Sequence, residues 1–273
     1  MATQHSTVAD TWTPADFGKL LNKAIEAKST AFKAGTLFAT DKVKAQFPLW
    51  NSDPAAAWLD ELELITPTDG STGEVIVIPS KVGGITTLSN EIADDTDPEI
   101  ADAAAAGLAN DIAGKIDAAF LANTTPKANN GLLSVASQTV DTGATVTNED
   151  PFIDALFAAE SVGAQISHWI MHPNVAKNLS KIKKAAGSNE RLLQRTADGA
   201  VIAGVPVLID SKVDAATTAW GVDASRIKIV LRKGTEMKRF DVPRQDAIDV
   251  RGIARVGFGF LHPQSVVRLY DAP

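Results

Sequence analysis

The longest regular hydrophobic pattern in the chain is helical. Asp97 and Pro98 are typical of an N-cap and a first helical turn, and no helix breaker follows until Thr124–Pro126. At about 1.5 Å per residue, such a helix spans roughly 36 Å. Four-residue spacing makes its apolar stripe wind around the rod, so we expect the two ends to touch different neighbours. The larger apolar residues of the stripe are Ile100, Leu108, Ile112, Ile116 and Phe120.

A second long pattern, near the C-terminus, has the two-residue period of a strand. Apolar or small residues alternate from Ile248 to Phe260, which predicts a strand of about 43 Å. Val75–Ile78 and Ile85–Leu88 are shorter strand-like runs before the helix, and Val266–Tyr270 can return beside the long strand. These patterns predict a long helix lying on a long sheet.

Between these two patterns, helical and strand-like segments alternate, as is typical of a compact α/β domain. The predicted segments are a helix over Pro151–Val162 capped by Asp150, a strand over Ile166–Met171, a helix over Pro173–Ala185, and strands over Val205–Ile209 and Ile227–Leu231.

The first part of the chain is different, because its apolar residues do not form a self-contained unit. Phe17 belongs to a predicted amphipathic helix, whereas Trp50 and Trp58 lie in a stretch of short apolar pieces interrupted by prolines. Aromatic side chains in such an arm need a partner surface.

Composition fits a folded chain and narrows the chemistry. The 273 residues are 45% hydrophobic and include no cysteine, which excludes disulfides and thiolate sites. Residues 51–123 carry 14 acidic and 2 basic side chains, whereas residues 226–273 carry 10 basic and 5 acidic ones. This segregation fits either two solvated faces or electrostatic complementarity between copies of the chain.

Catalytic and metal-binding motifs are absent from the sequence. It contains no P-loop, nucleophile elbow, zinc-binding histidine pair or dinucleotide-binding glycine pattern. His168 and His172 are interpreted as turn and capping residues. The acidic cluster at 91–99 lacks the spacing of a calcium loop and suits a helix N-terminus, and the lysines of 177–184 suit a solvated or inter-subunit face. We therefore predict no enzyme, no cofactor and no metal site.

Four segments in a fixed order carry a resemblance to a known family. They are VIVIPSKVGGITTLSNEIADD before the helix, WIMHPNVAKNLSKIKKAAG, IAGVPVLIDSKV and IDVRGIARVGFGFLHPQSVVRL. With them the chain resembles the tailed-bacteriophage major capsid proteins of the Hong Kong ninety-seven type. The resemblance implies an α+β capsid fold, and it divides the chain into an N-terminal arm (1–50), an extended hairpin or E-loop (51–88), a spine helix of the peripheral domain (89–131), an axial domain (132–232) and the long strands of the peripheral domain (233–273).

By the same resemblance, the chain self-assembles as hexamers and pentamers into the icosahedral shell of a virion, around double-stranded DNA that it binds without sequence specificity. Scaffolding, portal and decoration proteins are candidate partners, and no membrane is involved. The family's covalent cross-link is not expected, because residues 51–73 contain no lysine. An encapsulin-type shell around cargo protein is the alternative, and an α/β enzyme is the alternative from another class.

The predicted inter-subunit contacts combine exposed aromatics, acidic side chains, helix glycines and basic side chains of the terminal sheet. The glycines weaken the helix, which indicates that something packs closely there. The predicted residues are Phe17, Trp50, Trp58, Glu61, Glu63, Asp94, Asp95, Gly107, Gly114, Arg251 and Arg255.

Overall fold

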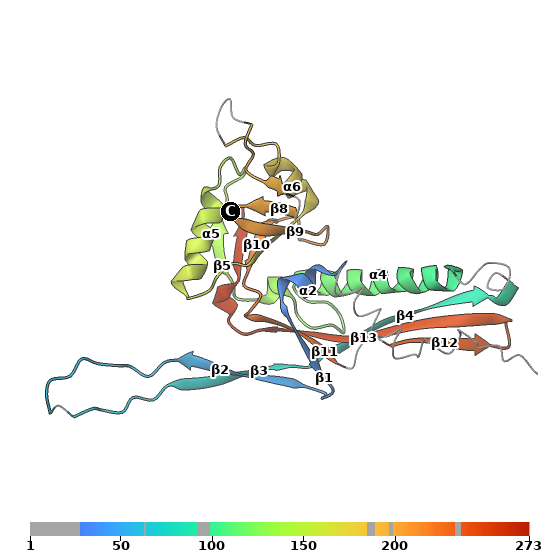
Figure 1. The fold of residues 1–273 in the computed structure, drawn as a ribbon, viewed down its shortest axis with the longest axis horizontal. Coiled ribbons are helices and arrows are strands. Elements are labelled where there is room, and N and C mark those ends of the chain that lie inside the picture. The colour runs from blue at the N-terminus through green and yellow to red at the C-terminus, as the bar shows by residue number, and fades with distance from the viewer. Residues whose placement is uncertain are drawn as a thin grey trace, which may run out of the picture.

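The computed structural model describes residues 28–62, 64–91, 99–184, 189–196, 199–232 and 236–272. Figure 1 shows three parts in this portion of the chain: a long sheet with a long helix beside it, a second sheet flanked by shorter helices, and a narrow ribbon that extends away from both.

The long sheet is organised around β13 (Ala247–Phe260), the strand predicted from the C-terminal alternation. Along one edge β13 pairs antiparallel with β4 (Ser80–Ser89). Along the other edge it pairs antiparallel with β12 (Glu236–Val242) and β11 (Ile227–Arg232), and β1 (Thr36–Thr40) adds a parallel strand beside β11.

The predicted long helix is present as α4 (Glu99–Leu121), and it packs on one face of this sheet. Ile112, Ile116 and Phe120 are buried, and the Phe120 ring meets the Phe258 ring edge-on at 5.3 Å between centroids. Each fully buried side chain of this size contributes about 1.5–3 kcal/mol. A Cβ atom placed on Gly252 would lie 3.0 Å from Ile112, so the even-numbered residues of β13 face the helix. The proposed cap, Asp97 and Pro98, lies outside the described residues.

The second sheet is the centre of the predicted compact domain. Its strand order is β5 (Gln138–Asp141), β14 (Val267–Tyr270), β10 (Thr217–Val222), β6 (His168–Met171), β9 (Val205–Ile209), β8 (Gly199–Ile202) and β7 (Gln194–Thr196). Helix α5 (Asp150–Ser161) packs against β5 and β14. Phe152 of α5 meets Trp169 of β6 edge-on at 5.2 Å, and both side chains are fully buried.

Helix α6 (Pro173–Leu179) is shorter than the sequence pattern predicts. The Ser180 hydroxyl donates to the Ala176 carbonyl, and the chain then forms an isolated β-bridge between Lys183 and Arg191. This side-chain bond and the bridge replace further helical turns. The N-cap of α5 also differs by one residue, since Glu149 precedes the helix and Asp150 begins it.

Strands β14 and β11 each belong to a different sheet from the one predicted from the sequence. Val266–Tyr270 is expected beside β13, but β14 pairs with β10 and β5 in the second sheet, because a 3-10 turn over Pro263–Ser265 redirects the chain. Val267 and Leu269 are thereby buried in the core around Trp169. Conversely, β11 falls in the range expected for the axial domain but pairs with β13, and Ile227 and Ile229 join the core under α4.

The ribbon consists of β2 (Ala45–Ser52) and β3 (Ser71–Val77), paired antiparallel. It begins before residue 51 and ends before residue 88, and β4, which the sequence analysis included in the hairpin, belongs to the long sheet. Ala45 and Val77 at the base of the ribbon are buried with Val230 of β11. The rest of the ribbon extends away from both sheets (Figure 1).

A short helix, α2 (Thr30–Ala34), joins the N-terminal segment to the core. Asp117 of α4 is 6% exposed, and its Oδ1 atom accepts hydrogen bonds from the Ser29 hydroxyl at 2.5 Å and the Ala31 amide at 2.9 Å. Burial raises the pKa of this carboxyl above its usual value, although these hydrogen bonds oppose the shift. Asp117 therefore anchors α2 to the long helix.

Candidate inter-subunit surfaces

The ribbon ends in a loop whose apolar side chains are open to solvent. We call residues 53–62 and 64–70 the ribbon tip. Trp58 and Leu62 are fully exposed there, with relative exposures of 103% and 101%, and Leu64 and Ile65 are also exposed. Trp50, on β2 at the base of the tip, is 53% exposed. An apolar group of this size on a two-stranded ribbon indicates a surface that another molecule covers.

The ribbon tip is also acidic. Asp53, Asp60, Glu61 and Asp69 are exposed along it, and the tip contains no lysine or arginine. It therefore combines negative charge with apolar side chains, and its partner must offer positive charge and an apolar contact.

The sheet face opposite α4 has this complementary character. We call it the outer face, formed by the odd-numbered side chains of β4 and β13 with the even-numbered side chains of β12 beside them. In the strand register Arg251 lies between Ile85 and Lys238, and Arg255 lies beside Lys81. The Arg251 guanidinium stacks on the Phe240 ring, with Cζ 4.7 Å from the ring centroid.

The apolar part of the outer face is uncovered. Ile85 is 57% exposed and Phe240 41% exposed. The two predicted arginines, Arg251 and Arg255, are thus placed together with an apolar surface that the sequence analysis did not assign. The signal for Ile85 is present in the sequence, since it alternates in phase with Lys81, but the position of Phe240 depends on the β12–β13 register.

The ribbon tip and the outer face lie at opposite ends of the molecule (Figure 1). The ribbon extends to one side of the second sheet, whereas β4, β12 and β13 extend to the other side. The acidic and basic surfaces therefore do not meet within one copy.

Comparison with known proteins connects these surfaces to a family. The model of the phage capsid family matches residues 11–270. The chain belongs to the phage capsid family. It is a major capsid protein, a structural component of the virion shell rather than an enzyme. The phage interpretation of the sequence is confirmed.

Solved structures support the fold over the whole chain. A chain from Mycobacterium phage Bobi is 17% identical, with 99% of this chain and 94% of that one covered and a TM-score of 0.73. A capsid chain of an empty GTA particle, computed with C5 symmetry, is 17% identical, with 100% and 96% covered and a TM-score of 0.76. A chain from Microbacterium phage Oxtober96 is 13% identical, with 99% and 96% covered and a TM-score of 0.74. No curated protein sequence matches the chain.

The helix glycines of the capsid protein have no close neighbour among the residues that the structure describes. No described atom other than the helix's own lies within 4 Å of a Cβ placed on Gly107 or Gly114. The described residues of one copy therefore do not pack tightly against these glycines, and contact with a second copy stays a prediction. Phe17, Glu63, Asp94 and Asp95 fall outside the described residues, and so does most of the acidic cluster at 91–99.

His168 and His172 each contact a neighbouring polar group of the chain. The Asn174 amide donates to His172 Nδ1 at 3.1 Å, so His172 caps α6 as predicted. His168 Nδ1 lies 3.1 Å from the Ser167 hydroxyl, and burial lowers the pKa of this histidine. Among the described residues, no group of three or more histidine, aspartate or glutamate side chains could hold a metal ion. No helix in that part of the chain is long and apolar enough to cross a membrane.

Proposed function

We propose that the capsid protein associates as hexamers and pentamers that close into the icosahedral shell of a tailed phage, and that the ribbon tip of one copy docks on the outer face of the next. The observation that carries this proposal is the position of the two surfaces. They match in charge and apolar character, and they lie at opposite ends of one subunit (Figure 1).

The contact contains two physical contributions. Trp58 and the leucines of the tip remove apolar area from water when they cover Ile85 and Phe240, at about 25 cal/mol per Å². Glu61 and its acidic neighbours face Arg251 and Arg255, which orients the two copies and speeds their association more than it strengthens the final contact. Because each copy carries both surfaces, a ring forms when the rotation between neighbours closes.

The parts of the fold receive roles from this arrangement. The chain before the ribbon supplies the N-terminal arm, whose strand β1 joins the long sheet, and the ribbon with its tip is the E-loop. Helix α4 and the long sheet form the peripheral domain, and the second sheet forms the axial domain. The capsid of the GTA particle was computed with C5 symmetry, which supports pentamers of the related fold.

The shell that these capsomers form would enclose double-stranded DNA without reading its sequence. Scaffolding, portal and decoration proteins complete the set of proposed partners. The predicted contacts at Phe17, Glu63, Asp94 and Asp95 remain part of this proposal, because they flank the arm, the ribbon tip and the start of α4 in the sequence.

The test is a charge exchange across the contact. Arg251→Glu combined with Arg255→Glu places like charges opposite the ribbon tip, so particle yield in electron micrographs should fall, most strongly at low salt. Adding Glu61→Lys and Asp60→Lys should restore part of the yield. The stability of the subunit should fall by no more than about 1 kcal/mol, mainly because the stacking of Arg251 on Phe240 is lost. Normal particles from the double arginine variant at every salt concentration would contradict the docking.

A further inference from the structure

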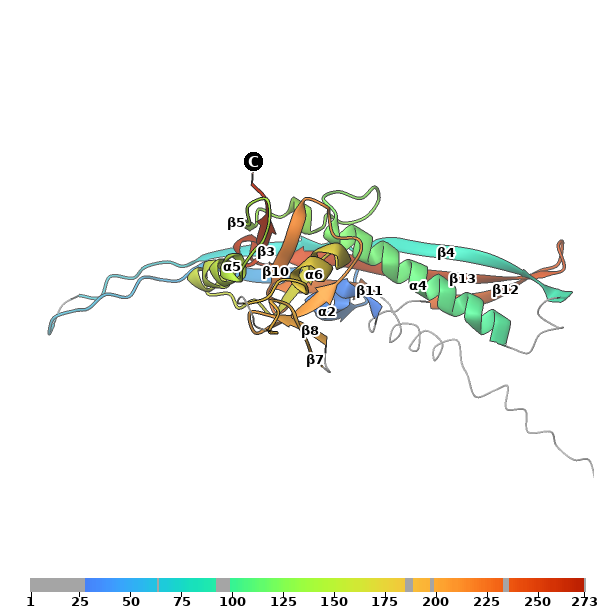
Figure 2. The same ribbon diagram turned by 90° about the horizontal axis from the view of Figure 1, so that it is seen from above.

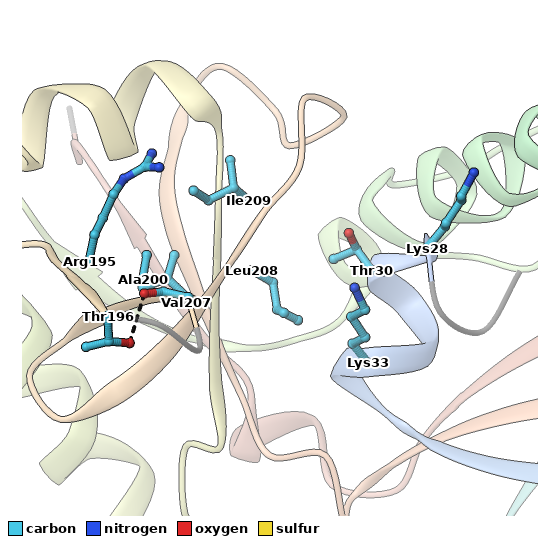
Figure 3. Close-up of a pocket in the computed structure, with 10 residues that line it drawn as sticks. Lys28, Thr30, Lys33, Arg195, Thr196, Ala200, Val207, Leu208 and Ile209 are labelled. Carbon is cyan, nitrogen blue, oxygen red and sulfur yellow. Dashed lines mark hydrogen bonds between the residues drawn. The ribbon is translucent and has the colours of Figure 1, made fainter. Parts of the chain in front are cut away.

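A cleft of about 450 Å³ lies between α2 and the second sheet. Lys28 and Lys33 stand on one wall, and Arg195 of β7 stands on the opposite wall, beside β8 and β9 (Figure 3). These residues are more than 160 positions apart in the sequence, and only the fold brings them to one opening. No aspartate or glutamate lines the cleft among the described residues.

The positive surface continues beyond this cleft. Arg195 also lines a neighbouring hollow of about 320 Å³, together with Lys177, Lys181 and Arg191. That hollow likewise has no acidic lining residue in the described part of the chain. We call the combined surface the basic track, which consists of Lys28, Lys33, Lys177, Lys181, Arg191 and Arg195.

The charges of the basic track are largely not neutralised by the subunit. All six side chains belong to exposed residues. In the described part of the chain, Lys33, Lys177, Lys181 and Arg195 form no ion pair, whereas Lys184, just outside the track, pairs with Glu149 at 3.0 Å. On a chain with net charge −7, this local group of like charges creates a positive potential that attracts an anionic partner.

We propose that the basic track contacts the phosphate backbone of the double-stranded DNA inside the shell, and this inference rests on the proposed function. Lysine and arginine side chains on separate elements can follow phosphates without fixed geometry, and such contacts carry no sequence information. The track contains no aromatic side chain on which a base could stack.

A second copy of the chain fits the track less well. Its acidic ribbon tip carries Trp58, Leu62, Leu64 and Ile65, which need an apolar surface. The outer face offers exposed Ile85 and Phe240, whereas of Val207, Leu208 and Ile209, which line the cleft, only Ile209 is exposed. The phosphate backbone, which is anionic along its whole length, matches the track more closely.

Contact with DNA inside the shell also determines which side of the subunit faces the interior. Figure 2 shows α2, β7 and β8 toward one side of the molecule, and β5 with the C-terminal end toward the opposite side. The side with α2, β7 and β8 therefore faces the interior of the shell.

The test compares DNA binding by two variants with the same loss of charge. Lys33→Gln with Arg195→Gln removes one charge from each wall of the cleft. Lys42→Gln with Lys44→Gln removes two exposed charges near the base of the ribbon and is the control. Binding of unassembled full-length protein to a short DNA duplex of arbitrary sequence is measured by fluorescence anisotropy between about 50 and 200 mM salt.

The slope of log Kd against log salt decreases by about 0.9 for each lost phosphate contact, so the cleft variant should lose nearly two units of slope and the control none. Equal effects of both variants, or no effect of either, would overturn the inference. Wild-type DNA binding with weakened self-association of the cleft variant would also overturn it and would assign the track to a second copy. Electron microscopy of the wild type tests the proposed shell separately, because particles can form whether or not the track binds DNA.

Discussion

Two tryptophans show how differently the second sheet and the ribbon tip of this capsid protein are built. Trp169 in β6 is fully buried against Phe152, whereas Trp58 in the ribbon tip is fully exposed. Trp169 belongs to a sheet whose apolar side chains are buried within the subunit. Trp58 belongs to a segment whose apolar side chains find no cover in the subunit.

The difference indicates which regions stabilise the folded subunit and which serve contacts between copies. The second sheet and its helices bury their core within one copy, so they stabilise the subunit. The ribbon tip adds exposed apolar surface and acidic charge, which are unfavourable for an isolated chain and useful only between copies. The long sheet is intermediate, because α4 covers one face and the outer face is bare.

The largest expected effect on the subunit is at Trp169. Trp169→Ala removes a buried ring and leaves a cavity, so the free energy of unfolding should fall by about 3–5 kcal/mol in chemical denaturation. The matched variant Trp58→Ala should change it by less than about 0.5 kcal/mol. Similar losses from both tryptophans would break the comparison.

Asp117 should have the next largest effect, because it joins the N-terminal segment to α4. Asp117→Ala leaves the Ser29 hydroxyl and the Ala31 amide without their acceptor, which costs about 1–3 kcal/mol. Limited proteolysis near residue 29 should accelerate at the same time. Unchanged stability and unchanged cleavage would show that α2 is held by its apolar contacts alone.

The same carboxyl gives a pH prediction with a definite sign. Burial raises the pKa of Asp117 in the folded state above its value of 3.8 in the unfolded chain. The contribution of this group to stability is therefore full below pH 3.8 and decreases as the pH rises through the folded pKa. Asp117→Asn keeps an oxygen acceptor and removes the charge, so its stability relative to wild type should improve from acid to neutral pH. Denaturation curves measured for both proteins over this range check the sign, and an opposite trend would contradict it.

The ribbon tip should affect assembly without affecting the subunit. Trp58→Ser combined with Leu62→Ser removes two fully exposed apolar side chains, so the free energy of unfolding should shift by less than about 0.5 kcal/mol while particle yield falls. Sedimentation separates subunits, capsomers and shells in the same sample. Normal shells from this variant would refute the role of the tip.

The smallest effect on the subunit is expected at the α4 glycines. Among the described residues, leucine at Gly107 or Gly114 meets no close neighbour, and it favours the helix by up to about 1 kcal/mol. Shell assembly should nevertheless decrease if a second copy packs there. A stabilised subunit that assembles normally would remove both glycines from the set of contacts.

The local patterns of the sequence predicted the elements well where one periodicity persisted. Helix α4 and strands β9 and β13 follow from the spacing of their apolar residues, and His172 caps α6 as its place before Pro173 indicates. The predicted end of α6 at Ala185 was wrong. The Ser180 hydroxyl donates a hydrogen bond back to the helix, and the chain then forms a β-bridge.

For the candidate surfaces, the sequence predicted part of the residues and none of the geometry. Trp58, Glu61, Arg251 and Arg255 were found from exposed aromatics and segregated charge. Phe240 was missed because its place beside Arg251 depends on strand pairing. Gly107 and Gly114 were predicted as inter-subunit contacts, and because no described residue lies close to them, contact with a second copy stays a prediction.

The sequence by itself determined the long helix, the long strand, the compact α/β region and the family, because these depend on periodicity and order along the chain. Tertiary structure alone decided that β14 joins the second sheet, that the acidic tip and basic outer face lie at opposite ends, and that Lys33 and Arg195 face one cleft. The physical reason is that local spacing fixes which face of an element is apolar. Which distant face covers it depends on the packing of the whole chain.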